Sequence, residues 1–424
     1  MTFSDILTFE ITDILEHLEH NGFAAFLVGG CVRDAILKRE CHDIDIATNA
    51  STSEMLEIFK DYETMTCGIG FGTVNVRGKS GNIFDITSFR QEGEYLDGRH
   101  PSYITFSGDI HTDLARRDFT VNAMAVNMHH ELVDDFGGLN DCTIKQIKCV
   151  RNPKLRFSED YLRILRALRF SAVLDFSVET QTAEAIRELS LLTENIPAER
   201  AFDELKKLFS TPYNLRLSKL LNDFPEVFNV FFPDSDLQKS AIRLETLQNE
   251  KNFILKMAIT LSQTNPAKFY FLNHENFFSK SDEKLFHSLL YIDSQKLQNR
   301  NDAVKQISLL GKENLEKIRT LKKSSPTELE LINEIQNDID NGVFPVGINE
   351  LTIKGTDLIS AGLHGKAIGQ TLDLLLNLVQ NKKLSNEKEA LLEWVKENTL
   401  TKNKKSPPFE QRQSNFIYSQ AFEI

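Results

Sequence analysis

The chain contains little proline, little cysteine and a single tryptophan. Its 424 residues include 11 prolines, about half of the usual ~5%. Because proline restricts the unfolded chain, this scarcity predicts a flexible protein with a low melting temperature. The five cysteines are odd in number and form no CxxC pair, which argues against a disulfide framework and a zinc site. They are expected to be reduced and mostly buried; they are Cys31, Cys41, Cys67, Cys142 and Cys149.

The sequence also has no run of 18 apolar residues, which argues against a membrane-spanning helix. Its amino-terminal stretch is acidic and typical of an amphipathic helix, without the basic start and apolar centre of a signal peptide. We therefore predict a cytoplasmic protein with no membrane partner. The formal net charge of −12 argues against indiscriminate binding to nucleic acid, but it allows a local basic surface.

The most informative stretch is residues 26–48, which read FLVGGCVRDAILKRECHDIDIAT. A hydrophobic strand is predicted to end at Gly29-Gly30, and the helix that follows carries Arg33. Glycine lets the backbone approach a phosphate closely, and a helix N-terminus presents free N–H groups to an anion. Asp43 and Asp45 are two residues apart on a second predicted strand, so their side chains share one face. Two such carboxylates repel each other unless a cation lies between them, and Mg²⁺ is the hard, oxygen-binding candidate.

Taken separately, a double glycine is usually an ordinary turn, and Asp-x-Asp is usually a solvated strand edge. Their combination at this spacing, with Arg33 able to meet phosphate, favours a catalytic interpretation. A phosphate cradle beside paired carboxylates is suited to metal-assisted attack on a nucleoside triphosphate.

A second motif, DLARRDFTVNAMAVN, occupies residues 113–127. Arg116-Arg117 is predicted to begin a helix, where both side chains suit phosphate binding. Asp118 and Asn122 are predicted to share one helical face and to hydrogen-bond a ribose or a base. The alternative is an ordinary helix start with a capping aspartate.

The segment before this motif, Arg90–Ser107, is long and polar and contains glycine. Loops of this length are usually functional lids or disordered linkers. We expect this segment to be functional and to act as a lever.

A third motif, RFSEDYLRILRALRF, lies within a basic belt over residues 145–170. Ser158 is predicted to cap a helix, with Glu159 and Asp160 at its positive end. Asp160 and Arg163 are then neighbours that form either a surface ion pair or a pair that reads base edges. The belt itself indicates either a polyanion site or a solvated helix face. Its basic residues are Lys145, Lys148, Arg151, Lys154, Arg156, Arg163, Arg166 and Arg169.

The spacing of apolar residues divides the chain into two parts with different periods. Before about residue 150, strand-like and helix-like segments alternate. The predicted strands are Ala24–Val28, Asp43–Ala47, Thr73–Val76, Ile83–Thr87, Ala123–Asn127 and Leu132–Asp134. After Ser158 nearly everything is predicted helical, including Thr182–Thr193, Glu199–Phe209, Leu237–Gln263, Ala303–Leu321, Thr327–Asn341, Ala367–Gln380 and Asn386–Glu397.

Together these motifs resemble the class II nucleotidyltransferases of the DNA polymerase β superfamily, which include tRNA CCA-adding enzymes and bacterial poly(A) polymerases. The resemblance rests on LVGGCVRDAIL…DIDIAT, FDITSFR, RRDFTVNAMA, DDFGGLNDC, RFSEDYLRILRALRF and IPAERAFDELKKLF, in that order. The segment ELTIKGTDLISAGLHGKAIGQTLDLLLNLVQNKKLSNEKEALLEW is similar to the tail of CCA-adding enzymes from Gram-positive bacteria. There His364 and Lys366 stand where the family usually has proline.

The resemblance implies an α+β fold with a nucleotidyltransferase head built on a mixed sheet, followed by an all-helical neck, body and tail. We expect the head at residues 1–150, the neck at 151–213, the body at 214–325 and the tail at 326–400. A polar extension is expected at 401–424. The neck would recognise the base, and the body and tail would bind tRNA.

The resemblance also implies the roles of individual residues. Asp43 and Asp45 bind Mg²⁺, and Asp85 is a third catalytic carboxylate. Asp160 and Arg163 pair with the incoming C or A in place of a nucleic-acid template. The nucleotide-binding residues are Gly29, Gly30, Arg33, Arg117, Asp118, Asn122, Glu159, Asp160, Arg163, Arg166 and Arg169.

The activity that follows is two-metal addition and repair of the 3′-terminal CCA of tRNA from CTP and ATP. A poly(A) polymerase, or an enzyme that adds only CC or only A, is the alternative within the same chemistry. A non-catalytic RNA-binding protein is the alternative from another class, and the intact Asp43 and Asp45 pair argues against it.

Overall fold

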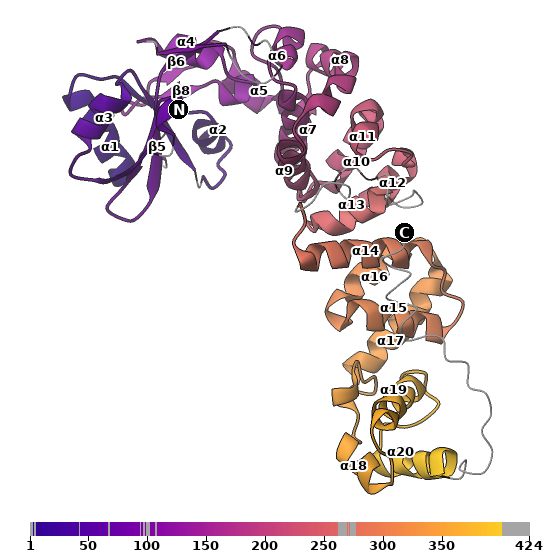
Figure 1. Ribbon diagram of the computed structural model, residues 1–424. Helices are drawn as coiled ribbons and strands as arrows, with labels where there is room; N and C mark the ends of the chain where they lie inside the picture. Colours follow the sequence, from indigo (N-terminus) through magenta and orange to yellow (C-terminus); the bar gives the residue numbers. More distant parts are fainter. Residues whose placement is uncertain are drawn as a thin grey trace. The chain divides into compact units, whose positions relative to one another are not determined.

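The computed structural model describes residues 3, 6–41, 43–66, 68–93, 95, 98, 102–106, 108–261, 269, 271 and 277–400. Cys67, the expected extension at 401–424 and parts of Arg90–Ser107 therefore lie outside the described residues. The chain, whose course is drawn in Figure 1, divides into two compact units. The first comprises Met1–Phe231 and Leu244–Lys251, and the second comprises Phe232–Arg243 and Asn252–Ile424.

A seven-stranded mixed sheet forms the centre of the first unit's amino-terminal half. The apolar residues of its strands alternate in burial, as in Val74 and Val76 or Phe84 and Ile86, which is the two-residue period of a strand with one covered face. Only β2 and β5 are parallel. The strand order is β3 (Glu63–Met65), β4 (Thr73–Arg77), β5 (Ile83–Ser88), β2 (Ile44–Thr48), β1 (Ala25–Val28), β8 (Ala125–Val126) and β9 (Leu132–Val133).

The predicted mixed sheet is confirmed, and every predicted strand belongs to it. β3 escaped prediction because it is three residues long and its sequence, ETM, has no apolar alternation. Asp43 lies just before β2, so the expectation that it belongs to the strand was wrong by one residue.

The register of three strands determines what the sheet presents to the site. Asp45 of β2 lies opposite Asp85 of β5, which lies opposite Asn75 of β4. Two residues further along, Ala47, Thr87 and Thr73 form the next row. Because side chains two apart share a face, both rows point to the same side of the sheet.

Short helices and a two-stranded ribbon accompany the sheet. Strands β6 and β7 pair antiparallel within the segment expected to be a loop, so part of that segment is a hairpin-like ribbon. The elements are α1 (Phe9–His20), α2 (Gly30–Ile36), α3 (Thr52–Ile58), η1 (Ile69–Phe71), β6 (Arg90–Glu92), β7 (Ile104–Phe106), α4 (Ile110–Ala115), η2 (Thr120–Asn122) and α5 (Gly138–Thr143).

Helices dominate the rest of the first unit, as predicted. Helix α7 is buried along most of its length and packs against α9. Two-residue strands, β10 and β11, form a parallel ribbon that interrupts the otherwise helical chain. The elements are β10 (Gln146–Ile147), α6 (Pro153–Glu159), α7 (Leu162–Leu174), β11 (Ser177–Val178), α8 (Thr180–Glu188), η3 (Ser190–Asn195), α9 (Ala198–Phe209), α10 (Asn214–Asp223) and α11 (Pro225–Phe231).

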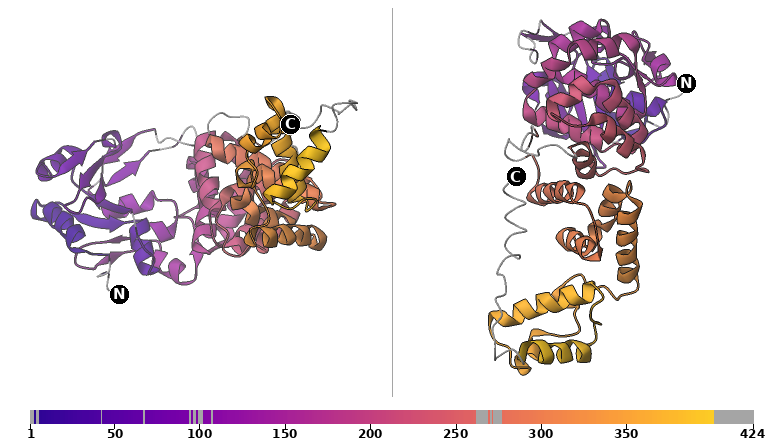
Figure 2. Two further views of the ribbon diagram at one scale, coloured as in Figure 1. Left: turned by 90° about the horizontal axis from the view of Figure 1, so that it is seen from below. Right: turned by 90° about the vertical axis from the view of Figure 1, so that its right-hand side faces the viewer.

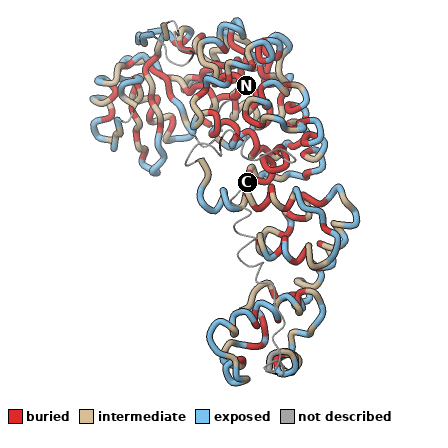
Figure 3. Tube along the Cα trace, turned by 45° about the vertical axis from the view of Figure 1, so that its right-hand side comes forward, coloured by how far each residue is buried: buried red, intermediate tan, exposed pale blue. Residues whose placement is uncertain are grey.

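The regular secondary structure described in the second unit is all helical (Figure 2). One of its apolar cores gathers Leu358, Leu375, Leu391 and Val395. Buried residues follow the inner faces of the helices and exposed residues the outer faces (Figure 3). The elements are α12 (Leu237–Glu245, shared with the first unit), α13 (Phe253–Leu261), α14 (Lys280–Ser294), α15 (Arg300–Leu310), η6 (Lys312–Asn314), α16 (Leu315–Lys322), α17 (Pro326–Asp340), η7 (Ile348–Glu350), α18 (Gly355–Ser360), α19 (Lys366–Gln380), α20 (Lys388–Val395) and η8 (Lys396–Leu400).

Two long helices predicted here are each divided in the structure. Leu237–Gln263 contains α12 and α13, and Ala303–Leu321 contains α15 and α16. In the second case Gly311, at φ +80°, caps α15 in a conformation that L residues rarely adopt. None of the described helices is long and apolar enough to cross a membrane.

The thiol prediction is confirmed in part. Cys31, Cys142 and Cys149 are buried and unbridged, whereas Cys41 is half-buried. Burial raises the pKa of Cys142 and of Cys149 to about 12, so both remain thiols near neutral pH.

Candidate active site

A cleft of about 780 Å³ lies within the first unit, between the sheet and the helices that follow it. Of the fourteen residues that the sequence assigns to catalysis or nucleotide binding, all but Asp85 and Glu159 line it. Those two lie beside lining residues, because Asp85 is paired with Asp45 and Glu159 precedes Asp160. The structure thus brings together motifs that are more than 100 residues apart in the chain. The lining members are Gly29, Gly30, Arg33, Asp43, Asp45, Arg117, Asp118, Asn122, Asp160, Arg163, Arg166 and Arg169.

The double glycine connects β1 to α2, as predicted. Gly29 has φ +75°, and a Cβ atom built on it would lie 2.7 Å from Nη1 of Arg117. A side chain at Gly29 would therefore be strained and would collide with an arginine of the cleft. The Gly29 N–H donates to the carbonyl of Met124 at 3.1 Å, which fixes the turn against the chain before β8.

Arg33 is buried in the wall of the cleft, with 8% of its surface exposed. Its guanidinium donates to both carboxylate oxygens of Asp34, at 3.0 and 2.9 Å, and to Oδ1 of Asn122 at 2.6 Å. It also lies 5.4 Å from the ring centre of Phe170. These contacts hold Arg33 in one orientation and join α2 to η2 and α7.

The carboxylates of Asp43, Asp45 and Asp85 converge at one edge of the cleft. Burial raises the pKa of Asp45, Arg117 opposes that effect, and the charges of Asp85 and Asp43 raise it further. Asp85 in turn accepts a 2.5 Å hydrogen bond from Nδ2 of Asn75. Mutual repulsion of this kind is relieved when a cation joins the carboxylates.

No group of three or more His, Cys, Asp or Glu side chains in the described part of the chain is arranged to enclose a metal ion. This finding is compatible with Mg²⁺, which usually binds through one or two carboxylates, with water and substrate phosphates completing its shell. Asp43 and Asp45 offer hard carboxylate oxygens, and the positive charge of Arg117 acts on Asp45, so the carboxylate pair fits a hard cation bound together with an anionic substrate.

Arg116 and Arg117 lie at the end of a helix, so the prediction that they begin one was wrong. Helix α4 begins earlier because Asp109 caps it by accepting from the His111 N–H at 3.1 Å, and Arg116 follows its last residue. The buried Asp113 binds both arginines, at 2.7 Å to Nη2 of Arg116 and 3.1 Å to Nη2 of Arg117. Burial raises the pKa of Asp113, but the two guanidinium groups lower it overall, so this carboxylate stays charged and orients both.

Asp118 and Asn122 are in contact, although not on the face of a helix as predicted. Asn122 ends the short η2, and its Nδ2 donates to Oδ1 of Asp118 at 3.2 Å. Asp118 also accepts a hydrogen bond from Nε of Arg166 in α7. One buried carboxylate therefore joins the second motif to the third.

The third motif has a different helical boundary from the predicted one. Helix α6 begins at Pro153 because Asn152 caps it and proline favours the first helical position, so Ser158 lies inside the helix. Glu159 ends α6, Asp160 is extended, and α7 starts at Leu162. The break places Asp160 at the cleft.

Asp160 and Arg163 do not form the ion pair considered from the sequence. Asp160 accepts from Nη2 of Arg200 at 3.1 Å, and Arg163 is bound by Glu159. Arg163 also donates to the carbonyl of Arg156 at 3.0 Å and lies 5.7 Å from the ring centre of Tyr95. Each base-reading candidate is thus held by a partner of its own.

Phe170 gathers three arginines of the cleft. Its ring centre lies 3.9 Å from the guanidinium carbon of Arg169, 5.3 Å from that of Arg166 and 5.4 Å from that of Arg33. Cation–π contacts of this kind hold like charges near each other at a desolvated site. Glu204 from α9 binds Arg169 and partly offsets the accumulated charge.

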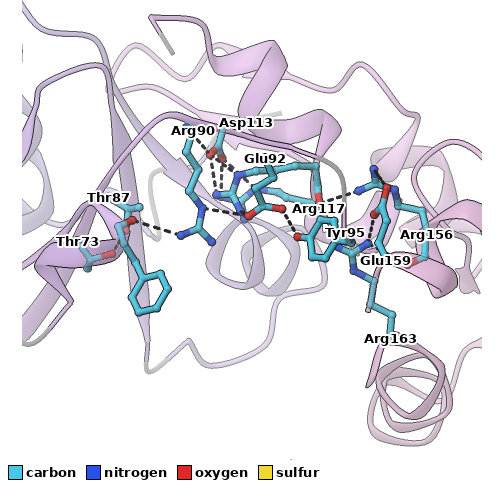
Figure 4. Close-up of polar contacts among 12 residues, drawn as sticks. Thr73, Thr87, Arg90, Glu92, Tyr95, Asp113, Arg117, Arg156, Glu159 and Arg163 are labelled. Atoms are coloured by element: carbon cyan, nitrogen blue, oxygen red, sulfur yellow. Dashed lines mark hydrogen bonds and ion pairs between the residues drawn. The ribbon is translucent and has the colours of Figure 1, made fainter. Parts of the chain in front are cut away.

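Several lining residues were not identified from the sequence. Glu92 joins Arg90 at 3.3 Å and Arg116 at 3.2 Å, and it accepts from Tyr95 Oη at 2.5 Å (Figure 4). No local pattern marks Glu92 or Tyr95, whereas Arg90 ends the FDITSFR motif. Arg200 could have been found, since it lies within the IPAERAFDELKKLF motif. The residues missed include Thr73, Thr87, Arg90, Glu92, Tyr95, Asp113, Phe170 and Arg200.

The chain is similar in sequence to known families and proteins. Residues 25–148 match the model of the Poly A polymerase head domain, and residues 175–237 match that of the probable RNA and SrmB-binding site of polymerase A. The CCA-adding enzyme of Streptococcus thermophilus is 33% identical over 397 residues, covering 90% of this chain and 95% of the relative. That of Pediococcus pentosaceus is 33% identical over 389 residues, covering 90% and 96%.

The fold of the chain is also similar to those of solved structures. The Bacillus stearothermophilus CCA-adding enzyme in complex with CTP has a TM-score of 0.70 at 26% identity, covering 92% of this chain and 97% of that one. The Thermotoga maritima CCA-adding enzyme complexed with tRNA has a TM-score of 0.72 at 22% identity, covering 93% and 96%, which bears on the fold alone.

Proposed function

The chain belongs to the family of CCA-adding enzymes, and we propose that it builds and repairs the 3′-terminal CCA of tRNA from CTP and ATP. The observation that carries the proposal is the convergence of all three motifs on one cleft, with carboxylates at one edge and arginines along the wall. A phosphate-binding wall facing a carboxylate edge suits transfer of a nucleotide to a hydroxyl group.

The match to full-length CCA-adding enzymes favours this function over poly(A) synthesis. The family model named for poly(A) polymerase covers the head, which both activities share, whereas the curated relatives extend over about nine-tenths of the chain. A non-catalytic role is disfavoured because Asp43 and Asp45 both line the cleft.

Each residue has a separable task in this proposal. Arg117, oriented by Asp113, and Arg33 neutralise the triphosphate, while Asp118 and Asn122 lie where a ribose can be held. Asp160 and Arg163 present acceptor and donor groups to the base edge. The 3′-hydroxyl of the tRNA attacks the α-phosphate, a new phosphodiester bond forms, and pyrophosphate leaves.

Asp43 and Asp45, with Asp85 beside them, would hold two Mg²⁺ ions. When bound, these ions supply the positive charge that activates the hydroxyl and stabilises pyrophosphate. The assignment of residues 151–213 to the neck, 214–325 to the body and 326–400 to the tail remains part of the proposal. So does the path of the tRNA along the helical parts.

The proposal is tested by incubating the protein with Mg²⁺ and a tRNA transcript that lacks CCA, and then sequencing the 3′ ends. CTP alone should give ends in CC, and CTP with ATP should give CCA. Long A tails, or only one type of nucleotide with both supplied, would favour the alternatives. No addition under any condition would support the non-catalytic interpretation.

A further inference from the structure

Two phenylalanines beside the cleft are exposed to solvent. Phe71, at the end of η1, has 63% of its surface exposed, and Phe106, at the end of β7, has 57%. Large aromatic side chains are usually covered, and adjacent exposed ones indicate a binding surface. Neither residue contributes to the core of the first unit.

The ring of Phe106 lies over the backbone next to Phe71. Gly72 follows Phe71 and has φ +82°, and a Cβ atom built on it would lie 2.5 Å from Cε1 of Phe106. Because Gly72 has no side chain, the Phe106 ring can lie against its backbone. Arg90 connects the pair from the other side, because it lies opposite Phe106 in the ribbon and its Nη1 donates to the Phe71 carbonyl at 3.3 Å.

The pair lies next to the second row of residues on the catalytic face of the sheet. Asp45, Asp85 and Asn75 form one row, and Thr87 and Thr73 belong to the next, whose hydroxyls are 2.9 Å apart. Phe71 ends η1 and is joined through Gly72 to Thr73, the first residue of β4.

The floor between the carboxylates and the aromatic pair is polar and cationic. Thr73, Thr87 and Arg90 all line the cleft, and Figure 4 shows Arg90 between the threonine pair and Glu92. An RNA strand whose 3′-terminal hydroxyl lies at the carboxylates would cross this floor. It would place a phosphate near Arg90 and a base near Phe71 and Phe106.

We propose that Phe71 and Phe106 form a stacking platform for the unpaired 3′-terminal bases of the tRNA under extension. Stacking suits this position because every base has a π face, so the platform accepts the terminal base whichever nucleotide was added last. The charge of Arg90 matches the phosphate of the same strand. The inference rests on the proposed function and assigns the primer side of the cleft, opposite the arginines that meet the triphosphate.

The test compares Phe71→Ala, Phe106→Ala and the double variant with wild type in steady-state CTP incorporation into tRNA that lacks CCA. The KM for tRNA should rise about 5- to 150-fold in the double variant, the range for loss of base stacking. The KM for CTP should stay within about twofold. Phe9→Ala, on α1 and 85% exposed, is the matched control and should change neither constant.

A spectroscopic readout separates stacking from a structural effect. tRNA with 2-aminopurine at its 3′ end should lose fluorescence on binding wild type and the Phe71→Trp variant, but not the double variant. If wild type adds nucleotides and the double variant keeps both the KM for tRNA and the quenching, the platform is wrong and the proposed function stands. If wild type adds nothing, the proposed function itself fails.

Discussion

Arg166 donates two hydrogen bonds to one oxygen of Asp118, at 2.8 Å from Nε and 2.6 Å from Nη2. The arginine belongs to α7, and the aspartate to the segment between α4 and η2. Asp118 also accepts from its near neighbours, including the Phe119 N–H at 2.8 Å. This pair therefore joins the motif proposed to bind phosphate to α7, which is proposed to read the base, and part of the charge proposed for nucleotide binding holds the cleft together.

The same pair predicts a dependence of stability on acid. Burial raises the pKa of Asp118, but Arg166 and the hydrogen bonds lower it to about 2, from an ordinary value of 3.8. Because the folded pKa is depressed, the stabilisation is present above pH ~4 and is lost as pH falls towards 2; it amounts to ~2 kcal/mol. Urea unfolding of wild type and Asp118→Asn should show a difference at pH 6 that shrinks towards pH 2.

Two details sharpen this measurement. The single tryptophan, Trp394, belongs to the second unit, so its fluorescence does not report unfolding of the first, and circular dichroism, which follows the helices of both units, is needed. Asp203→Asn, at an exposed position of α9, is the control and should behave as wild type. A difference between Asp118→Asn and wild type that is the same at pH 6 and pH 2.5 would contradict the assignment.

Base choice should depend on Asp160 and Arg163. Replacing either by Ala removes one partner of the base edge, so the preference for CTP and ATP over UTP and GTP should fall about tenfold or more. The KM for total triphosphate should change less, because Arg117 and Arg33 remain. Competition assays with mixed nucleotides measure the preference, and unchanged selectivity in both variants would leave these residues a purely structural role.

Arg200→Ala should produce a milder form of the same defect. Arg200 binds Asp160 at 3.1 Å and positions it at the cleft. Its loss should lower selectivity for the base that Asp160 recognises, with little effect on the melting temperature. Glu199→Ala, at the exposed neighbouring position, serves as the control. Equal selectivity in both variants would show that Asp160 needs no such support.

The segment Arg90–Ser107 should control the change from C to A addition. Among its described residues, Tyr95 donates to Glu92 and lies against Arg163, so it connects this segment to base reading. Tyr95→Ala should spare addition of CC and slow the final A, whereas Tyr95→Phe, which keeps the ring, should be less affected. Completion of CCA by Tyr95→Ala at the wild-type rate would refute the connection.

Stability of the second unit should respond to a single proline. Lys366 is the first residue of α19, a position that proline favours. Lys366→Pro should therefore add ~0.4–1 kcal/mol and raise the melting midpoint by about 2–4 °C. Trp394 fluorescence reports this unit, and Lys366→Ala is the control. No increase, with the helix intact by circular dichroism, would show that scarce proline does not limit stability here.

The sheet was predicted, and most of the predicted site residues do line the cleft, because both depend on local pattern. Alternating Val and Ile identified β4 and β5, and short spacings identified Asp43, Asp45, Gly29 and Gly30. Helix ends were predicted less well, because Asn152-Pro153 and Asp109 are stronger start signals than those chosen from the motifs.

Partners distant in sequence could not be predicted at all. Nothing local to Asp160 indicates that Arg200 would bind it, and nothing near Arg163 indicates the ring of Tyr95. These contacts arise only when α7, α9 and the segment after β6 are packed together. The roles of the site residues remain predictions that activity measurements must decide.

The central claim is that nucleotide transfer occurs at the carboxylate edge formed by Asp43 and Asp45. The most direct measurement is a single-turnover assay of Asp45→Ala with tRNA that lacks CCA, CTP and Mg²⁺, together with the Kd for that tRNA. Incorporation of C is expected to fall below detection while the Kd changes little, because the carboxylate is proposed to serve the chemistry and the helical parts to bind most of the tRNA. Incorporation by Asp45→Ala at a rate near that of wild type would contradict it.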